Sequence, residues 1–354
     1  MTIDEADIQA QPAERRGSLS DAALEQMLLT LERHGARVVG LDIYRDYPVH
    51  PDYPKLAAYL RQSDRLVGVC KSRDATVDPI GVSPPPELNK NLVGFSDFVD
   101  DADGVVRRHL VALEADPVST CTTPYAFSSR LAFLYLQDED IVPSFDSDGS
   151  LVLGEATFPP LQSRSGGYQP IDARGYQTML NYRALSTPSA IADRVSLTQV
   201  LNNQVNPEAI ADRIVLIGVT AHSLSDDWAT PYGAGSGDKT AGVFLQAQMT
   251  SQLISTALEG RPTLGVWPLW GDVLWLGSWA LLGWKLGNAL YPVKRGQIWR
   301  SLVYGATGML VIVGGGLWLL IVGIWVPLVP AALAFGGSVL GANYWEKSRP
   351  MPSR

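Results

Sequence analysis

The stretch RVVGLDIYRDYPVHPDYPKLAAYLRQSDRLVGVC, residues 37–70, decides the fold of the N-terminal part of this chain. Its apolar residues 37–41 predict a buried strand, and residues 65–70 predict a second one. Between them, Pro54 predicts the first turn of a helix that continues through Leu60. A strand, a helix and a second strand in this order are typical of a parallel pair joined by a crossover helix.

The same alternation extends over residues 1–263. Ser20 predicts the N-cap of a helix with an apolar face, and Gly35 predicts its end. Further strands are predicted at residues 2–4, 91–95, 105–113, 151–153, 176–181 and 213–219, and further helices at 124–137, 197–203 and 243–258. The sequence therefore predicts one α/β domain over residues 1–263, a mixed sheet with flanking helices.

Residues 264–354 have a different composition. They carry seven Lys and Arg but two acidic residues, a net charge of +5, whereas residues 1–263 carry −13. No charged residue lies between Ser301 and Trp345. Because an apolar run of about 18 residues can cross a bilayer as a helix, we expect three transmembrane helices at 267–291, 301–322 and 324–345, followed by a tail at 346–354. The first run is the weakest candidate because it contains Asp272 and Lys285.

The basic residues predict the orientation. They follow the first and the third predicted span: Lys294, Arg295, Arg300, Lys347, Arg349 and Arg354. By the positive-inside bias both segments are cytoplasmic, which leaves residues 1–263 outside. We expect a multi-pass protein of a bacterial plasma membrane with an extracytoplasmic head, a cytoplasmic C-terminus and membrane lipid around its helices. The acidic head argues against a nucleic-acid partner.

Small residues in the last two predicted spans allow close helix packing: Gly305, Gly308, Gly314, Gly315, Gly316, Gly337 and Gly341. At the other end, residues 1–16 contain four acids and no apolar run of a signal peptide. Residues 2–7 already have the pattern of a first strand and turn. We therefore expect that Met1 lies inside the fold and that one more apolar helix precedes it.

Four motifs follow one another along residues 1–263: RVVGLDIYR (37–45), LVGVC (66–70), GFSD with DGVVR (94–97 and 103–107), and IVLIG (214–218) followed by Asp227 and Thr230-Pro231. In this order, and followed by the three apolar runs of residues 264–354, these motifs resemble those of the CHASE type 2 family. Its members are extracellular sensory domains associated with bacterial cyclases and histidine kinases. The resemblance implies a sensor outside the membrane, joined through the spans to a cytoplasmic output domain. Members usually have a span before the sensor and often an output module after the spans, and neither occurs here.

The resemblance therefore implies a sensory protein for signal transduction without its own catalytic output. It would act through a separate kinase or cyclase, or as a remnant of a longer receptor. Two alternatives stay open. An extracytoplasmic enzyme anchored by its tail would need a nucleophile–base geometry in the structure. A structural membrane scaffold would have a closed head without a polar pocket.

Signatures of catalysis are missing from the sequence. It has no phosphate-binding Gly-x-x-x-x-Gly-Lys run, no kinase or cyclase signature and no Gly-x-Ser-x-Gly elbow. The four His residues lack metal-ligand spacing. We predict no enzyme activity, no catalytic residue, no metal and no cofactor.

Ligands of open α/β sheets gather beyond the carboxyl ends of the strands. Those ends offer Asp42, Arg45, Lys71, Thr220 and Asp227, which combine both charge signs with a hydroxyl. We predict that they contact an unidentified small polar ligand. The structural alternative is that Asp42 and Arg45 pair with each other and that Asp227 caps a turn.

Two further groups have competing interpretations. The acidic run Asp97, Asp100, Asp101 and Asp103, with Gly104, fits a calcium loop or an Asp-rich turn, and the missing later Glu of an EF-hand favours the turn. Cys70 and Cys121 could pair in an oxidising compartment. The buried strand around Cys70 favours a free core thiol instead.

Overall fold

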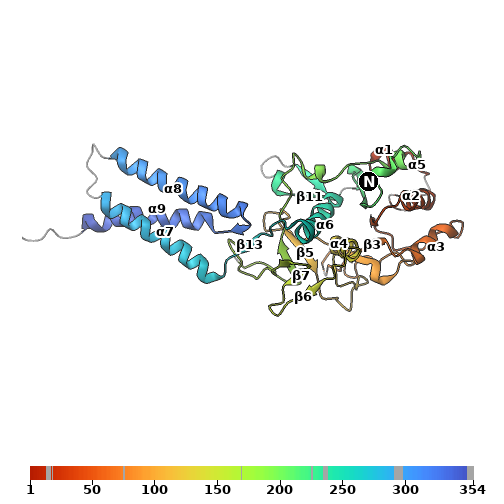
Figure 1. Ribbon diagram of the computed structural model, residues 1–354, viewed down its shortest axis with the longest axis horizontal. Helices are drawn as coiled ribbons and strands as arrows, with labels where there is room; N and C mark the ends of the chain where they lie inside the picture. The colour runs from red at the N-terminus through yellow and green to blue at the C-terminus, as the bar shows by residue number, and fades with distance from the viewer. Residues whose placement is uncertain are drawn as a thin grey trace, which may run out of the picture. The chain divides into compact units, whose positions relative to one another are not determined.

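The computed structural model describes residues 1–12, 17, 19–74, 76–168, 170–224, 226–233, 238–290 and 298–348. The chain forms two compact units (Figure 1). Unit 1 comprises Met1–Pro160 and Arg174–Arg261, and unit 2 comprises Leu161–Ala173 and Pro262–Arg354. The change in composition near residue 263 thus falls close to the boundary between the units, but the sequence does not mark the segment 161–173 as part of unit 2.

Unit 1 is built on a five-stranded sheet in which all strands run parallel. The strands lie in the order β1 (Thr2–Ile3), β10 (Ile214–Val219), β2 (Val38–Asp42), β3 (Leu66–Cys70) and β4 (Val93–Phe95). The predicted parallel pair is confirmed, because β2 and β3 are neighbours. The sheet is not mixed as predicted: in the described residues, the antiparallel pairs lie in separate small sheets.

Helices cover both faces of the sheet. On one face, α2 (Asp21–Arg33) and α3 (Pro54–Gln62) bury Leu28 and Leu56 in one cluster with Leu41 of β2. The hydroxyl of Ser20 accepts from the N–H of Ala23, as the predicted N-cap requires. On the other face, α4 (Phe127–Gln137) packs on Val38, Val67 and Val69, and α6 (Gly242–Glu259) lies beside α4 and over β10.

Short elements connect this framework. The small sheets pair β5 (Arg108–Ala112) with β9 (Tyr176–Met179), β7 (Leu151–Leu153) with β6 (Ser144–Phe145) and β8 (Ala156–Phe158), and β11 (Asp227–Ala229) with β12 (Lys239–Ala241). The short helices are α1 (Glu5–Gln9), α5 (Leu197–Leu201), η1 (Lys90–Leu92), η2 (Pro188–Ile191), η3 (Pro207–Ala209), η4 (His222–Leu224) and η5 (Pro231–Gly233). Each predicted strand and helix of unit 1 has a counterpart, with ends that differ by a few residues.

The helix α6 is unusual because much of its buried face is polar. Gln246, Gln248, Thr250, Gln252 and Ser255 are all nearly fully buried. Their side chains bond mainly to backbone groups of other segments. For example, Gln248 Nε2 donates to the carbonyl of Pro188 and Gln252 Nε2 to that of Met179. Directional hydrogen bonds therefore fix the position of α6, in addition to apolar packing.

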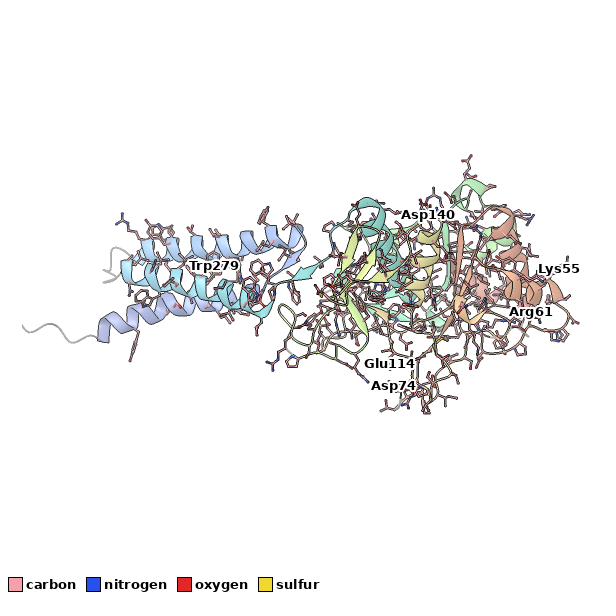
Figure 2. The ribbon with its side chains drawn as sticks, turned by 60° about the horizontal axis from the view of Figure 1, so that its bottom comes forward. Lys55, Arg61, Asp74, Glu114, Asp140 and Trp279 are labelled. Atoms are coloured by element: carbon pink, nitrogen blue, oxygen red, sulfur yellow. A yellow bond between two sulfur atoms is a disulfide. The ribbon has the colours of Figure 1, made fainter. Side chains whose placement is uncertain are left out.

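Unit 2 contains three long helices that lie side by side, α7 (Leu269–Leu290), α8 (Ile298–Ile321) and α9 (Leu328–Ser348) (Figure 1). Figure 2 shows Trp279 on α7, and it shows exposed charged residues such as Lys55, Arg61 and Asp140 on unit 1. In the described part of the chain, one stretch, Leu302–Ile321, is long and apolar enough to be a membrane-span candidate, with a mean hydropathy of 1.7.

The other two helices do not meet that standard. The apolar part of α9 is shorter, Leu328–Ala342, and α7 carries Asp272, Lys285 and several Trp and Gly residues, which lower its hydropathy. The third predicted span begins too early, because residues 324–325 form the strand β14 (Ile324–Trp325), which pairs with β13 (Gly265–Val266). The basic residues Lys294, Arg295, Arg349 and Arg354 lie outside the described residues.

Glycines bring the helices of unit 2 together at fewer positions than predicted. A Cβ at Gly308 would collide with Phe335, and one at Gly316 would lie 2.8 Å from Leu328. A Cβ would meet nothing at the remaining predicted positions: Gly305, Gly314, Gly315, Gly337 and Gly341. Gly283 and Gly287 of α7, which were not predicted, pack against the backbone of α9. Close approach thus uses α7 and α9 as well as α8 and α9.

The segment 161–173 packs on the turn between α8 and α9. Cβ atoms at Gly166 and Gly167 would lie 2.8 and 2.9 Å from the Trp325 ring, and the rings of Tyr168 and Trp325 are 5.1 Å apart at their centroids. The glycines are required here because any side chain would displace the indole.

Candidate functional site

The carboxyl ends of the parallel strands bring polar residues together at one edge of the sheet. We call this region the carboxyl edge and define it by Asp42, Lys71, Ser96, Asp97 and Thr220, which end or follow β2, β3, β4 and β10. The arrangement follows from the topology, because parallel strands end on the same side of a sheet.

The side chain of Asp42 projects toward the face that α6 covers. Side chains alternate along a strand, so Asp42 shares its face with Val38, which packs under α4. The partner of Asp42 on β10 is Gly218, and a Cβ at Gly218 would collide with Val243 in the first turn of α6. Asp42 therefore lies beside the N-terminal turn of α6.

Asp226 joins Asp42 from a different part of the chain. It lies between η4 and β11, and a Cβ at Gly242 would collide with its carboxylate. The Asp226 carbonyl accepts from the N–H of Gly242 at 2.8 Å, and Trp228 Nε1 donates to its Oδ1 at 2.7 Å. The loop before β11 thus delivers a second carboxylate to the start of α6.

Burial and mutual repulsion change the protonation of these acids. Burial, with a further contribution from the charge of Asp226, raises the pKa of Asp42 to about 7. Burial also raises the pKa values of Asp97 and Asp226, and the charge of Lys71 partly offsets both shifts. Three carboxyl groups therefore have raised pKa values at the carboxyl edge, and the positive charge of Lys71 acts on two of them.

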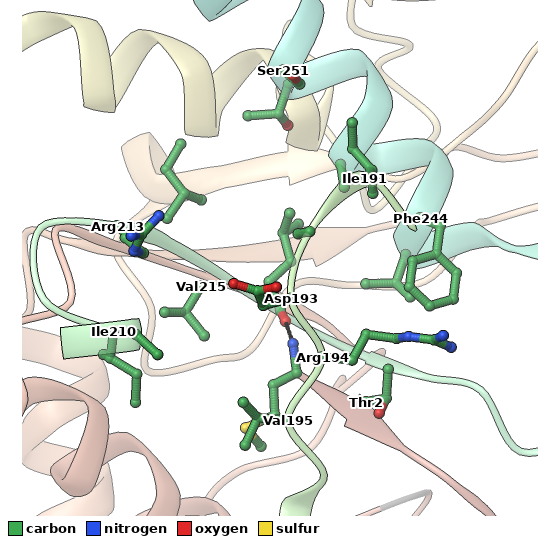
Figure 3. A pocket seen from close by; sticks show the side chains of 18 of the residues that line it. Thr2, Ile191, Asp193, Arg194, Val195, Ile210, Arg213, Val215, Phe244 and Ser251 are labelled. Atoms are coloured by element: carbon green, nitrogen blue, oxygen red, sulfur yellow. Dashed lines mark hydrogen bonds between the residues drawn. The ribbon is translucent and has the colours of Figure 1, made fainter. Parts of the chain in front are cut away.

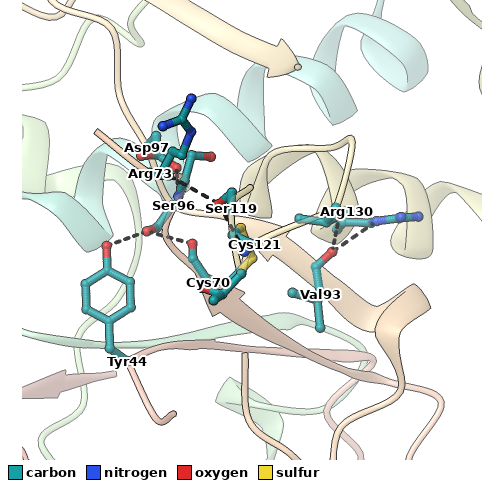
Figure 4. The surroundings of a disulfide bond; sticks show 12 residues. Tyr44, Cys70, Arg73, Val93, Ser96, Asp97, Ser119, Cys121 and Arg130 are labelled. Carbon is teal, nitrogen blue, oxygen red and sulfur yellow. Dashed lines mark hydrogen bonds between the residues drawn. A yellow bond between two sulfur atoms is a disulfide. The ribbon is translucent and has the colours of Figure 1, made fainter. Parts of the chain in front are cut away.

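Hydrogen bonds hold the other polar groups of the carboxyl edge. The hydroxyls of Tyr44 and Ser96 are 2.7 Å apart, and the Ser96 hydroxyl donates to the carbonyl of Cys70 at 3.3 Å (Figure 4). The N–H of Ser72 donates to Asp97 Oδ2 at 3.0 Å. Gln246 of α6 reaches the same place, because its Nε2 donates to the carbonyl of Ser96 at 3.3 Å.

A disulfide lies directly beside these groups. Cys70, the last residue of β3, is bonded to Cys121, with Cα atoms 5.4 Å apart (Figure 4). The free core thiol favoured by the sequence is therefore wrong. The burial of Cys70 was correctly inferred, but the sequence alone did not show that the loop ending at Cys121 returns to the end of β3.

The five predicted ligand residues have different surroundings. Asp42 and Lys71 lie at the carboxyl edge, and the Thr220 hydroxyl donates to the carbonyl of Ile3 at 3.5 Å. Arg45 is buried and pairs with Asp21 of α2 at 2.7 Å, on the side away from α6, and not with Asp42. Asp227 pairs in register with Ala241, and its Oδ2 is 3.9 Å from His222 Nδ1.

Sequence reasoning did not assign several residues to this site. The sequence places Asp97 only in the acidic run, and it does not single out Asp226. The sequence does not reveal that Asp226, directly before β11, faces Gly242 while Asp227 pairs with Ala241. Tyr44, Ser96 and Gln246 carry no motif, although the position of Gln246 one turn after Gly242 is a weak signal.

The acidic run itself is an ion-paired turn. Arg107 contacts both carboxylate oxygens of Asp103 at 2.8 Å and Asp101 at 2.9 Å. Arg108, which is buried, also bonds to Asp101 at 2.9 Å. In the described residues, no group of three or more His, Cys, Asp or Glu side chains has an arrangement that could hold a metal ion.

A groove of about 610 Å³ lies elsewhere in unit 1, between α6 and β10 (Figure 3). Phe244, Ser251 and Ile254 line it from α6, and the half-buried Val215 lines it from β10. Three arginines and three acidic residues line it: Arg183, Arg194, Arg213, Asp193, Asp212 and Glu259. None of the five predicted ligand residues lines this groove.

Comparison with known proteins identifies the family to which unit 1 is similar. The family model described as the CHASE2 domain matches residues 1–284. No curated protein and no solved structure matches the chain. The matched range includes all of unit 1 and most of α7.

Proposed function

Because the chain belongs to the CHASE2 domain family, we propose that it is a membrane-anchored, extracytoplasmic sensory protein whose output is carried by a separate partner. CHASE2 domains are sensory extracellular domains associated with signal transduction and are not catalytic. The match over residues 1–284 is the observation that carries the proposal.

Three features support the membrane anchor and the location of unit 1. The stretch Leu302–Ile321 meets the requirements of a span, α9 packs along it, and α7 packs on α9. The Lys and Arg residues after α7 and α9 favour a cytoplasmic location for those segments. The disulfide Cys70–Cys121 suits an oxidising compartment. The finer proposal is therefore three spans, an external head and an internal C-terminus, in a bacterial plasma membrane.

The sensory role is proposed to reside at the carboxyl edge. A stimulus there acts at the first turn of α6, and α6 runs to residue 259, close to the start of unit 2 at Pro262. The partner that reads the signal would be a kinase or a cyclase in the membrane or the cytoplasm, because the family resemblance associates such sensors with these two classes of enzyme.

Reporter fusions at four positions test this topology. A reporter that is active only in the cytoplasm is fused after Glu259, Lys294, Gly323 and Arg354. Three spans predict activity at Lys294 and Arg354 and silence at Glu259 and Gly323. Activity at Gly323 with silence at Lys294 indicates that α8 alone crosses, and activity at Glu259 contradicts the external head.

A second measurement tests whether a change at Asp42 reaches the C-terminal end of α6. Hydrogen exchange of the full chain in nanodiscs is compared between the natural protein and the Asp42→Asn variant. We expect altered exchange in the last two turns of α6, far in sequence from residue 42. Exchange that changes only around β2 would contradict transmission through α6.

A further inference from the structure

We propose that the carboxyl edge binds an organic cation with several N–H donors, a primary ammonium or a guanidinium, between Asp42, Asp226 and Gln246. The inference rests on the proposed sensory role and names the class of ligand.

The free polar groups at this place are acceptors. Gln246 is 2% exposed, and its Oε1 has no hydrogen-bond partner in the described part of the chain, whereas its Nε2 is used by the carbonyl of Ser96. An amide oxygen buried without a partner costs free energy, and a bound donor removes that cost. The carboxylates of Asp42 and Asp226 add further acceptors beside it.

Helix geometry directs Gln246 toward the two acids. Gln246 follows Gly242 by one turn, so both lie on the same face of α6. Helical side chains lean toward the N-terminus of their helix, so the Gln246 amide extends back toward Gly242. The Asp226 carboxylate lies against Gly242 at the same place. Val243, the residue after Gly242, packs on Gly218, which is the register partner of Asp42.

The charges select a cation over an anion. Asp42, Asp97 and Asp226 outnumber the single positive charge of Lys71, whose effect is felt by Asp97 and Asp226. Partly buried carboxylates favour a positive ligand because it offsets the cost of their desolvation. An anion would add to the repulsion that already exists between Asp42 and Asp226.

The coordination favours an organic cation over a metal ion. Calcium needs about six to eight oxygen ligands at short distances, and no group of three metal-binding side chains converges in the described residues. An ammonium or guanidinium needs only acceptors at ordinary hydrogen-bond distance.

Aromatic rings also lie near these acceptors. Tyr44 is 45% exposed, and Trp228, which donates to Asp226, packs on Phe98 with 5.1 Å between the ring centroids. Such rings attract organic cations.

The test is isothermal titration calorimetry of the full chain in nanodiscs. The probes are agmatine, which carries a guanidinium and an ammonium, 1,4-diaminobutane, and the neutral 1,4-butanediol. We expect saturable binding of at least one of the two cations and none of the diol. Asp42→Asn removes a negative charge and Gln246→Met removes the amide acceptor, so each weakens binding about tenfold or more. Glu155→Gln, an exposed acid in the turn between β7 and β8, serves as the matched control and binds as the natural protein does.

Three outcomes overturn the inference. The first is no binding of either cation by the natural protein. The second is equal binding by all variants, which indicates non-specific attraction to the acidic surface. The third is calcium binding that both variants abolish while neither amine binds. Thermal melting identifies any variant that does not fold. If Asp42→Asn does not fold, Gln246→Met, which keeps all the carboxylates, still tests the site. A failure here leaves the reporter topology unaffected, so the two proposals fail separately.

Discussion

Gly218 of β10 lies directly opposite Asp42 of β2, and Val243 of α6 fills the space where a side chain of Gly218 would lie. The contact places the first turn of α6 on β10, next to the end of β2 that carries the acid with the raised pKa. Asp42 and the start of α6 are therefore linked through one residue of the neighbouring strand, Gly218.

Gly218→Ala is expected to destabilise unit 1. The added methyl group collides with Val243, and overpacking of this kind costs about 1–3 kcal/mol. The midpoint of thermal unfolding, followed by circular dichroism, should fall by roughly 2–10 °C. Gly277→Ala is the control, because a Cβ there meets no atom within 4 Å. An equal effect of both variants would contradict the packing described here.

Asp42→Asn is expected to change how stability depends on pH. The pKa of Asp42 is about 7 in the folded protein, above its ordinary value of 3.8, so between these values the folded protein keeps a proton that the unfolded chain has lost. The free energy of unfolding therefore falls as the pH rises from about 4 to about 7. Asparagine does not titrate, so this decrease in the free energy of unfolding is absent in the variant. Since Asp42 is partly exposed, we expect roughly 1–2 kcal/mol at pH 8, or a melting temperature about 2–8 °C higher, and no change at pH 4. A rise of the same size at both pH values would contradict a titrating Asp42.

His109 is expected to limit stability in acid. It is fully buried, and burial lowers its pKa from 6.5 to about 3. Its Nε2 bonds to the Ser128 hydroxyl at 2.9 Å. Below pH 6.5 the unfolded chain gains a proton that the folded protein does not, so stability falls as the pH decreases from about 6.5 to about 3. In His109→Gln this slope becomes shallower, as measured by urea unfolding at pH 7 and pH 4.5. An unchanged slope would assign acid unfolding to other groups.

Loss of the disulfide is expected to destabilise unit 1. Cys70 and Cys121 are 51 residues apart, and closing a loop of that length stabilises a protein by about 2–4 kcal/mol. A double Ser variant should unfold at correspondingly lower denaturant concentration. Because these are the two cysteines of the chain, a reductant should have the same effect on the natural protein and none on the variant. Insensitivity of the natural protein to the reductant would show that the bond does not form.

The framework of unit 1 follows from the sequence because its signals are local. The cap at Ser20, the apolar runs of β2 and β3 and the Pro at the start of α3 each depend on a few neighbouring residues. The parallel order of β2 and β3 follows in turn from the crossover between them. The position of β10 between β1 and β2 does not, because no local signal tells where a strand from residue 214 inserts.

The sequence places residues at the carboxyl edge only where they end or directly follow a strand. Asp42 and Lys71 are next to β2 and β3, so topology alone locates them. Asp226, Gln246 and the partner of Cys70 come from distant segments, and their approach depends on how α6 packs on Gly218. The assignment of Arg45 to the same site depended on its closeness in sequence to Asp42, but its side chain turns to Asp21 on the other face of the sheet.

The buried polar face of α6 also bears on how the sequence of unit 1 can vary. The glutamines of α6 bind backbone carbonyls of residues 96, 179 and 188 and backbone N–H groups of residues 181 and 183. Every amino acid supplies such a carbonyl, and every one except proline supplies the N–H. The loops around α6 can therefore diversify during evolution without changing the register of the helix. The sequences of those segments can thus change while the position of α6 is kept.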